Sequence, residues 1–454
     1  MRWINRLIDS VTDKGKELLN AEDPARIGGK YTLAEDCNAL LSYRGDATAL
    51  AMAQQIHNRY SSASEEEKID FFAHLSTHFS PDFDEISTLA STLSHEHSSD
   101  AYKQLLNSIK GGRQMLFELL NIPGTGTQAL VKMRTELLNL LPEHPEFAVV
   151  DVDLKYTLET WFNRGFLEFR EINWNTSADV LEKLISYEAV HEIQDWADLK
   201  RRLTGDRSCF AFFHPALLDD PLIFVQVAFT EEISDRIDPF INHEQPVTSS
   251  SSTNTAIFYS ISNCQTGLRG ISFGNFLIKQ VVQQIQKERP QITRFSTLSP
   301  VPGLTRAIRK NYITEDTLHQ IAGPLLPSLQ KRYADMPLIE LICERYDRLD
   351  ESHDDTVSFM NELGVYYLTQ LKHGIEPYDP VARFHLSNGA SIYRINPFGN
   401  RKEYGLKSSA GLMVNYLYDL ERVEMNHESF KKNGAIDIHR NLKKQQKKIR
   451  ALAS

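Results

Sequence analysis

The stretch Ala256–Leu298 reads AIFYSISNCQTGLRGISFGNFLIKQVVQQIQKERPQITRFSTL, and its pattern decides how the second part of the chain folds. Ala256–Ser262 is a short apolar run with aromatic and β-branched residues, which predicts a strand. Gly267–Gly274 is rich in glycine and predicts a turn, after which apolar residues recur at helical spacing to about Lys287. Thr293–Leu298 predicts the next strand. The elements therefore follow one another as strand, turn, helix and strand.

The segment Phe295–Gly303 reads FSTLSPVPG and places a serine at the end of that last strand. Pro300 excludes the right-handed helical region from Ser299 and has no N–H to donate to a sheet. We therefore expect the strand to end or splay at Ser299.

A histidine stands in a second informative segment, Val381–Pro397, which reads VARFHLSNGASIYRINP. We interpret Val381–Ser387 as a strand because its residues alternate, so that Arg383, His385 and Ser387 share one face. A cation beside His385 favours the neutral imidazole. A histidine in a strand and a serine at a strand end can meet across a sheet, far apart in sequence, and transfer protons together.

Two further elements are predicted after this segment. Asn388-Gly389 is typical of a hairpin turn and leads into a strand over Ser391–Ile395. Gly411–Tyr418 predicts the beginning of a closing helix whose tyrosines can reach a pocket.

The first 150 residues predict helices only. Met1–Leu19 has amphipathic spacing interrupted by aspartates, which predicts a first helix and not a mitochondrial presequence. Ser64, followed by three glutamates and an apolar-periodic run, predicts a helix N-cap, and Thr127 is expected to cap a later helix. Charges of both signs mix here, so we expect residues 1–150 to form a helical bundle for packing or oligomerisation. Residues 151–454 form the second domain, with a helical insertion over Leu326–Gly374.

Composition limits the classes of function. The chain has 454 residues, a formal net charge of −10 and four cysteines. Its length predicts two or three domains, and its negative charge argues against a general nucleic-acid binder. The cysteines lack metal-ligand or disulfide-framework spacing, which fits a reducing, cytoplasmic location. No apolar run approaches the ~20 residues of a membrane span, so no membrane partner is expected.

The segments around Ser299, His385 and Arg269–Ile278 together resemble malonyl-CoA decarboxylases, closely from about residue 150 onward and more loosely before it. The resemblance implies an α+β protein, in which an all-helical domain precedes a catalytic domain of the Gcn5-related acetyltransferase (GNAT) type. It also implies a homodimer or homotetramer that binds malonyl-CoA and acetyl-CoA and serves fatty-acid metabolism.

In that family a serine and a histidine are catalytic, and they correspond to Ser299 and His385 here. An active-site tyrosine of the family corresponds to Tyr418, whereas an active-site glutamate falls on Ser272, so the role of that glutamate is not carried over. The implied reaction is the decarboxylation of malonyl-CoA to acetyl-CoA and CO2 through a thioester enolate that the Ser/His pair protonates. No metal or organic cofactor is expected, because the thioester itself takes up the electrons.

The glycine-rich turn has two interpretations. In acetyltransferases such a turn holds the coenzyme A pyrophosphate on backbone N–H groups at a helix start. Arg269, Gly270, Ser272 and Gly274 match that pattern, except that Ser272 replaces its middle glycine. Residues 270–274 also spell G-x-S-x-G, the nucleophile elbow of serine hydrolases. The preceding strand is expected to end near Ser262, and this spacing disfavours the elbow.

Three other functions are distinguished from decarboxylation by their requirements. An acyltransferase on the same fold needs a carboxylate base near the acyl group, and the sequence offers no strong candidate. A non-catalytic acyl-CoA-binding protein would keep the glycine-rich turn and tolerate loss of His385. A serine hydrolase would use Ser272 as its nucleophile.

Overall fold

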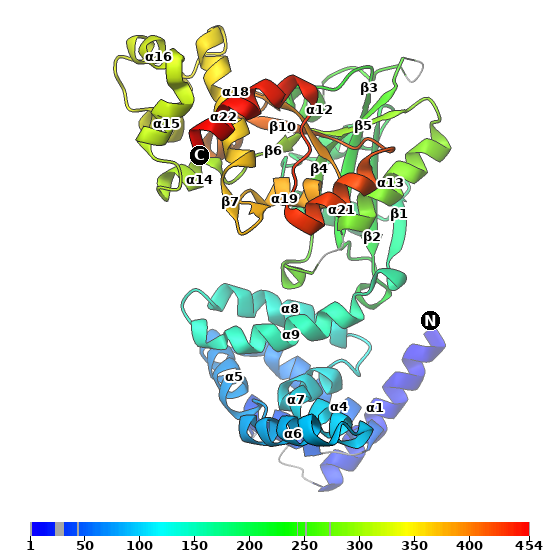
Figure 1. Cartoon of the computed structure of the whole chain (residues 1–454). Coiled ribbons are helices and arrows are strands. Elements are labelled where there is room, and N and C mark those ends of the chain that lie inside the picture. Colours follow the sequence, from blue (N-terminus) through cyan, green and yellow to red (C-terminus); the bar gives the residue numbers. More distant parts are fainter. Residues whose placement is uncertain are drawn as a thin grey trace. The chain divides into compact units, whose positions relative to one another are not determined.

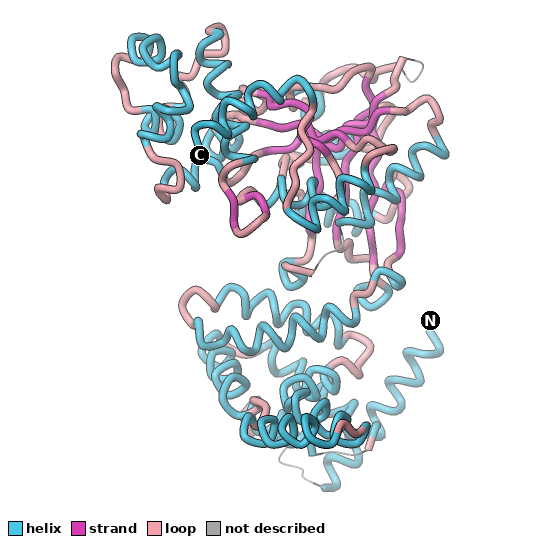
Figure 2. Tube along the Cα trace, in the orientation of Figure 1, coloured by secondary structure: helices cyan, strands magenta, loops and turns pink. Residues whose placement is uncertain are grey.

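The computed structural model of the protein describes residues 2–22, 31–42, 45–242, 244–249, 252–271 and 274–453. The chain forms two compact units. The first consists of Met1–Glu168, Phe213–Leu222 and Gln265–Ser272, and the second of Phe169–Phe212, Ile223–Cys264 and Phe273–Ser454. Helices dominate the first unit, whereas the second contains a mixed sheet with helices around it (Figures 1 and 2). The predicted α+β class, with a helical region before a sheet domain, is confirmed.

The long helices of the first unit are α1 (Arg2–Glu22), α3 (Leu33–Ser42), α4 (Asp46–Ser62), α5 (Glu65–His78), α6 (Phe83–Glu96), α7 (Ser99–Leu120), α8 (Gly126–Leu140) and α9 (Ala148–Trp161). A capping box starts α5 as predicted: the Glu67 N–H donates to Ser64 Oγ at 3.2 Å, and the Ser64 N–H donates to Glu67 Oε2 at 2.8 Å. Thr127 does not cap α8. It lies inside this helix and donates to Asn121 Oδ1 at 2.7 Å.

The predicted domain boundary at residue 150 lies inside α9 and within the first unit, whose first stretch continues to Glu168. The role of the helical unit in packing or oligomerisation stays a prediction. Among the described residues, no helix combines the length and the apolar character that crossing a bilayer requires.

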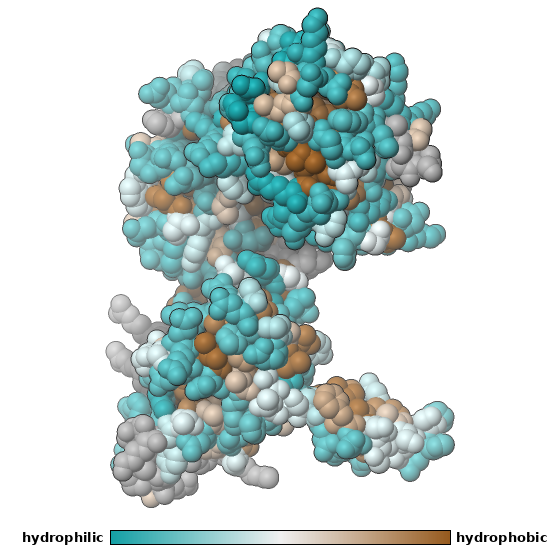
Figure 3. All heavy atoms as spheres, turned by 90° about the vertical axis from the view of Figure 1, so that its left-hand side faces the viewer, coloured by the Kyte–Doolittle hydropathy of each residue, from teal (hydrophilic) through white to brown (hydrophobic). Residues whose placement is uncertain are grey.

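An apolar patch lies on α6 and the first half of α7, which pack against each other. Helix α6 has no buried residue, and Phe83 at its start is 73% exposed. Tyr102, Leu106 and Ile109 recur at helical spacing on α7 and are also exposed. Figure 3 shows apolar side chains on this lobe, at its lower right. We call these four residues the α6–α7 patch; exposed apolar surface of this kind is typical of interaction sites.

The sheet of the second unit has the strand order β1-β2-β3-β4-β5-β10-β6, and β9 pairs with β10. The strands are β1 (Glu168–Ile172), β2 (Arg207–Phe213), β3 (Ile223–Thr230), β4 (Thr255–Asn263), β5 (Arg294–Thr297), β6 (Ser299–Pro300), β9 (Ser391–Asn396) and β10 (Met413–Leu417). Strand β3 is antiparallel to both β2 and β4, whereas β4 is parallel to β5. Helix α13 (Gly274–Glu288) connects these two parallel strands, which confirms the predicted order of strand, turn, helix and strand.

The parallel pair β4 and β5 separates at Ser299. The two strands pair from Thr255 and Arg294 to Phe258 and Thr297, after which β4 continues to Asn263 without β5. Residue 299 begins β6, which pairs with β10 on its other side. Pro300 therefore ends the pairing with β4 at the predicted place, since it cannot continue a sheet ladder as a donor.

Helices surround this sheet and make up the rest of the second unit. They are α10 (Ala178–Tyr187), α11 (Trp196–Arg202), α12 (Asp238–Ile241), α14 (Leu304–Arg309), α15 (Glu315–Ala322), α16 (Leu326–Arg332), α17 (Leu338–Cys343), α18 (Asp354–Thr369), α19 (Pro380–Ser387), α20 (Glu403–Ser409), α21 (Val423–Asn433) and α22 (Lys443–Ala453), besides α13. The predicted helical insertion, residues 326–374, contains α16, α17 and α18. A small hairpin of β7 (Lys372–His373) and β8 (Glu376–Pro377) follows it.

Three of the predicted elements are wrong. Val381–Ser387 is part of helix α19 and not a strand, because Asp379 provides an N-cap and Pro380 fits the first helical position. Gly389, with φ of +82°, follows the end of this helix and does not form a hairpin turn. The predicted closing helix over Gly411–Tyr418 is strand β10.

Candidate active site

Ser299 and His385 meet in the second unit. Ser299 is the first residue of β6, and His385 lies in the last turn of α19. The distance from Ser299 Oγ to His385 Nε2 is 3.0 Å, and both residues are buried. The structure therefore brings together the two side chains that the sequence predicts as a pair, although 86 positions separate them.

The pattern of hydrogen bonds assigns the tautomer of His385. Ser299 Oγ donates its one proton to Thr297 Oγ1 at 2.9 Å, so it accepts from His385 and the proton of the imidazole lies on Nε2. Nδ1 then accepts from Tyr418 Oη, which lies 2.8 Å away. The predicted tyrosine therefore joins the pair, and donors point in one direction from Tyr418 through His385 and Ser299 to Thr297.

Burial keeps His385 uncharged. Its ring stacks on Tyr416, with the ring centroids 4.7 Å apart, and the Phe384 and Tyr418 rings contact it edge-on. Burial lowers the pKa of His385 to about 3, so the imidazole is neutral near pH 7. The predicted cause, a cation at Arg383 on the same face, is wrong: residues two apart on a helix face different sides. Burial also raises the pKa of Tyr418, which keeps its donor proton.

Three residues of this site are not among the predicted site residues: Thr297, Tyr416 and Asp379, although Tyr416 is one of the two tyrosines of Gly411–Tyr418 that were expected to reach a pocket. The Asp379 side chain caps α19, with Oδ1 accepting from the Ala382 N–H at 2.8 Å, and Tyr367 Oη donates to Oδ2 at 3.2 Å. An aspartate before a proline and an apolar run is a helix-start signal that could have identified this residue. Thr297 and Tyr416 carry no comparable signal, apart from lying two residues from Ser299 and Tyr418 on their strands.

Of the glycine-rich turn, Arg269 and Gly270 belong to the first unit and Gly274 to the second. Arg269 follows a 3₁₀ turn, Thr266–Leu268, and Gly270 has φ of +83°, which favours glycine. Gly274 is the first residue of α13. Ser272 lies outside the described residues, so its role in coenzyme A binding and its role as a nucleophile both stay predictions.

A buried arginine of α8 fixes this turn. Arg134 is 2% exposed, and its Nη1 donates to the carbonyl oxygens of Gly267 at 2.7 Å and Arg269 at 3.0 Å. Its Nε donates to Asp151 Oδ1 at 2.7 Å. A Cβ atom on Gly267 would lie 1.9 Å from the carbonyl oxygen of Val131, so glycine alone fits there. The turn is thus held closely against α8.

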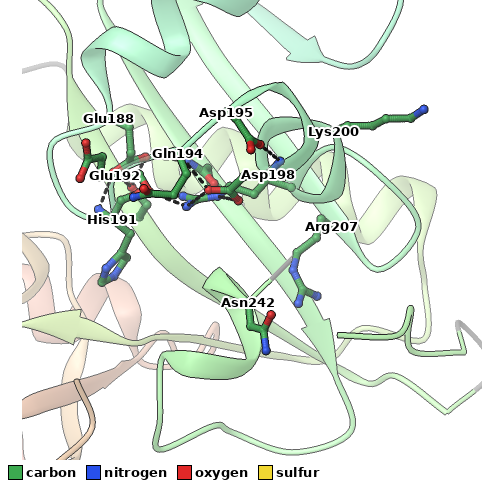
Figure 4. Close-up of polar contacts among 12 residues, drawn as sticks. Glu188, His191, Glu192, Gln194, Asp195, Asp198, Lys200, Arg207 and Asn242 are labelled. Atoms are coloured by element: carbon green, nitrogen blue, oxygen red, sulfur yellow. Dashed lines mark hydrogen bonds and ion pairs between the residues drawn. The ribbon is translucent and has the colours of Figure 1, made fainter. Parts of the chain in front are cut away.

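A second polar cluster in the second unit contains two carboxylates that are held by hydrogen bonds (Figure 4), whereas His191 Nε2 and Arg207 Nε are buried without a hydrogen-bond partner among the described residues. The Glu188 carboxylate accepts from Ser260 Oγ at 2.7 and 2.8 Å, and Arg202 donates to both oxygens of Asp198 at 2.8 and 2.9 Å. A cavity of ≈ 650 Å³ lies beside the cluster, lined by members of residues 188–198 and 400–407 together with Ile241. We interpret this cluster as structural.

The order strand, turn, helix and strand and a buried chain of hydroxyl, imidazole and phenol define the class of this protein as an α+β protein with a polar chain beside a splayed sheet. Residues 165–453 match the family model described as malonyl-CoA decarboxylase C-terminal domain. Residues 79–162 match the model described as malonyl-CoA decarboxylase N-terminal domain. The chain belongs to the malonyl-CoA decarboxylase family.

Solved structures and curated relatives agree with this family. Malonyl-CoA decarboxylase from Rhodopseudomonas palustris is 41% identical, with a TM-score of 0.82 over 91% of this chain and 98% of that one. The enzyme from Agrobacterium vitis is 39% identical, with a TM-score of 0.77 over 91% and 99%. The mitochondrial malonyl-CoA decarboxylase of Anser anser anser is 34% identical over 333 residues, which are 69% of this chain but only 65% of the goose protein. The corresponding mouse protein is 35% identical, covering 69% and 67%.

Proposed function

We propose that this chain decarboxylates malonyl-CoA to acetyl-CoA and CO2. Family membership supports the reaction, and one observation of the structure supports the chemistry: the directed hydrogen-bond chain from Tyr418 through His385 to Ser299. Such a chain delivers a proton to a carbon atom in a water-poor site, which is what the second half of this reaction requires.

The reaction needs an acceptor for electrons and a donor of one proton. When the bond between C2 and the carboxylate breaks, its electrons move into the thioester carbonyl, CO2 leaves, and an enolate forms. Hydrogen-bond donors that face the developing oxyanion stabilise it, each by about 3–4 kcal/mol. The thioester is itself the electron acceptor, so we propose that neither a metal nor an organic cofactor takes part.

The pair supplies the proton as neutral groups. Ser299 turns its hydroxyl from Thr297 towards C2, gives its proton to C2 and takes the Nε2 proton of His385, which acts as the general acid of the pair. Tyr418 positions the ring and passes its phenol proton to Nδ1 as the Nε2 proton leaves, so the negative charge of the enolate ends on the Tyr418 oxygen and no bare imidazolate forms. Solvent restores the proton after acetyl-CoA departs. A carbanion next to a thioester is a strong base, so a charged imidazolium is not needed, in agreement with the lowered pKa of His385.

The test is to incubate the purified protein with malonyl-CoA and a chelator in deuterium oxide and to follow acetyl-CoA by mass. We expect acetyl-CoA that carries one deuterium in its methyl group. His385→Ala and Ser299→Ala should each lower kcat by at least about 100-fold. Ser387→Ala is the matched control, because Ser387 lies on the same helix and its hydroxyl donates to the carbonyl oxygen of Phe384, one turn earlier in that helix. Near-normal turnover in either pair variant would remove the assignment.

The same assay separates the other functions. An acyltransferase would transfer the acyl group to an added amine and release little CO2, and a non-catalytic binder would leave malonyl-CoA intact. A serine hydrolase would be labelled at Ser272 by a phosphonate probe. Binding of the coenzyme A pyrophosphate by Arg269, Gly270, Ser272 and Gly274 is likewise a proposal. It is tested by the effect of Arg269→Ala on the KM for malonyl-CoA against that for malonyl-pantetheine, which lacks the pyrophosphate.

Assembly and location complete the proposal. We propose a homodimer or homotetramer that forms through the helical unit, as the exposed α6–α7 patch supports. A cytoplasmic location stays a prediction from the cysteine pattern, and the goose and mouse relatives are named mitochondrial. Fractionation of the native cells decides between these locations.

A further inference from the structure

A fully buried carboxylate joins the two elements that bear the proposed catalytic pair. Asp379 has no exposed surface. Its Oδ1 accepts from the Ala382 N–H at 2.8 Å and so caps α19, the helix of His385. The same carboxylate lies beside Gly303, in the loop directly after β6, the strand of Ser299: a Cβ on Gly303 would lie 3.6 Å from Asp379 Oδ2, and the Gly303 N–H is among the groups that lower the pKa of Asp379. One side chain therefore holds both the helix and the loop.

Tyr367 brings a third element to this carboxylate. Its Oη donates to Asp379 Oδ2 at 3.2 Å from α18. The fit around Gly303 is close, since a Cβ on Gly303 would lie 2.3 Å from Tyr367 Oη. Burial raises the pKa of Asp379 to about 6, and the hydrogen bonds from Ala382, Tyr367, Val381 and Gly303 oppose this rise. At neutral pH the carboxylate is therefore ionised and surrounded by neutral donors.

Helix capping does not require a buried charge at this place. Asparagine and serine cap helices about as well as aspartate, and a charge in the interior lowers stability unless it is well compensated. An ionised carboxylate differs from these caps in having two oxygens that only accept, with about four acceptor sites. That capacity matches the number of donors that α18, α19 and the loop after β6 direct at Asp379.

We propose that Asp379 is a positioning residue, which sets the 3.0 Å separation of Ser299 Oγ and His385 Nε2 by binding α19 and the loop after β6 together. This inference rests on the proposed function of the pair. Asp379 acts through the backbone of both elements and not on the reacting atoms. A displacement of about 1 Å between reacting groups lowers rates by about 100-fold, so small movements of α19 matter.

Protonation of the Asp379 carboxylate can be followed through the dependence of kcat on pH. The titratable groups that interact with it are Tyr367 of α18 and Tyr416 of β10. Protonation places a hydrogen on an oxygen that now accepts, so one of the surrounding donors loses its partner and the contact loosens. We therefore expect kcat to fall as the pH drops through about 6. Tyr367→Phe removes a hydrogen bond that lowers this pKa and should move the fall to higher pH.

The experiment measures kcat, KM and their pH dependence for the full chain and three variants with malonyl-CoA. Asp379→Asn keeps a helix cap but cannot accept at both atoms, so its kcat should fall about 100-fold, with KM changed by less than about threefold and the acidic fall of kcat lost. Tyr367→Phe should lower kcat less and shift the fall upward. Tyr366→Phe, on the partly exposed side of the same helix, is the control and should match the original chain.

Either of two results overturns the inference: Asp379→Asn with kcat within about threefold of the original, or Tyr367→Phe with an unshifted pH profile. If Asp379→Asn does not fold, Tyr367→Phe decides, because it keeps the carboxylate. If the original chain makes no acetyl-CoA, the proposed function has failed and NMR tests the positioning alone. The His385 Nε2–H resonance reports the hydrogen bond to Ser299. It should shift in Tyr367→Phe and stay unchanged in Tyr366→Phe. An unshifted resonance in Tyr367→Phe overturns the inference.

Discussion

Replacing Tyr418 by phenylalanine removes one oxygen atom and tests the proposed direction of the proton chain. In the structure Tyr418 Oη lies 2.8 Å from His385 Nδ1 and is the donor that makes Nδ1 an acceptor. Both residues are buried, so Tyr418→Phe leaves the ring nitrogen without this partner, which should lower the free energy of unfolding by about 1–3 kcal/mol.

The same bond holds the proton of His385 on Nε2, where Ser299 needs it. If the preference for this tautomer falls by about 1.4–2.8 kcal/mol, the ratio of the Nε2–H to the Nδ1–H form falls by about 10- to 100-fold, since 1.4 kcal/mol is a factor of ten, and kcat falls in proportion to the loss of the Nε2–H form. The KM should change little, because Tyr418 acts on the imidazole and not on coenzyme A. Phenylalanine keeps the ring contact with Phe258, so packing around the site is retained.

Turnover by acetyl-CoA formation, urea denaturation and nitrogen NMR of the imidazole together measure this variant. The expected combination is lower kcat, lower stability and a larger share of protonated Nδ1. A variant that keeps the original kcat while the Nδ1–H tautomer gains population would refute the reasoning, because the position of the proton would then be irrelevant to catalysis.

Three other predictions concern stability and assembly. The pKa of His385 is lowered from 6.5 to about 3, so the unfolded chain binds a proton that the native state does not, and the free energy of unfolding should decrease as the pH falls between these values. The raised pKa of Asp379 has the opposite effect on the free energy of unfolding between pH 3.8 and about 6, where the native state binds the additional proton. Urea denaturation at several pH values should therefore show a free energy of unfolding that depends more steeply on pH in Asp379→Asn than in the original chain. An unchanged slope counts against both pKa assignments. Gly267→Ala should lower the free energy of unfolding by about 1–3 kcal/mol, because its Cβ clashes with a carbonyl of α8. Gly124→Ala is the control and should be neutral, since nothing lies within 4 Å of the new Cβ. Equal melting temperatures for the two variants would contradict this prediction. Phe83→Asp in the α6–α7 patch should convert the oligomer to smaller species in light scattering, and an original chain that is already monomeric contradicts the assembly proposal.

The sequence predicted which residues meet at the site but not the element that carries His385. Alternation over Val381–Ser387 favoured a strand, yet seven residues are too few to separate a period of 2 from one of 3.6. Asp379 and Pro380 before this segment were the stronger evidence, because together they supply an N-cap and the fixed φ of a first helical residue. The pair still forms, since its geometry depends on where α19 is placed and not on the kind of element.

Other properties of the site depend on distant parts of the chain, so no local sequence pattern predicts them. His385 is neutral because β10 and β6 bury it, whereas sequence reasoning attributed this to the nearest cation along the chain. The partners of Asp379 lie 12 positions away at Tyr367 and much further away at Gly303. The strand break at Ser299 was predictable, because Pro300 restricts its neighbour whatever the tertiary contacts are.

The path of the chain between the two units limits how this protein can be divided. The polypeptide leaves the sheet unit twice, at residues 213–222 and 265–272, to become part of the helical one. The second of these excursions is anchored by Arg134 and has room only for a hydrogen atom at Gly267. A fragment that begins at residue 169 therefore keeps every strand after β1. It lacks Arg134, however, and so its glycine-rich loop has lost the side chain that anchors it. If the sheet region alone is grafted onto another protein, we expect the glycine-rich loop to be the first part to become disordered. The smallest module that can be transferred intact is therefore nearly the whole chain.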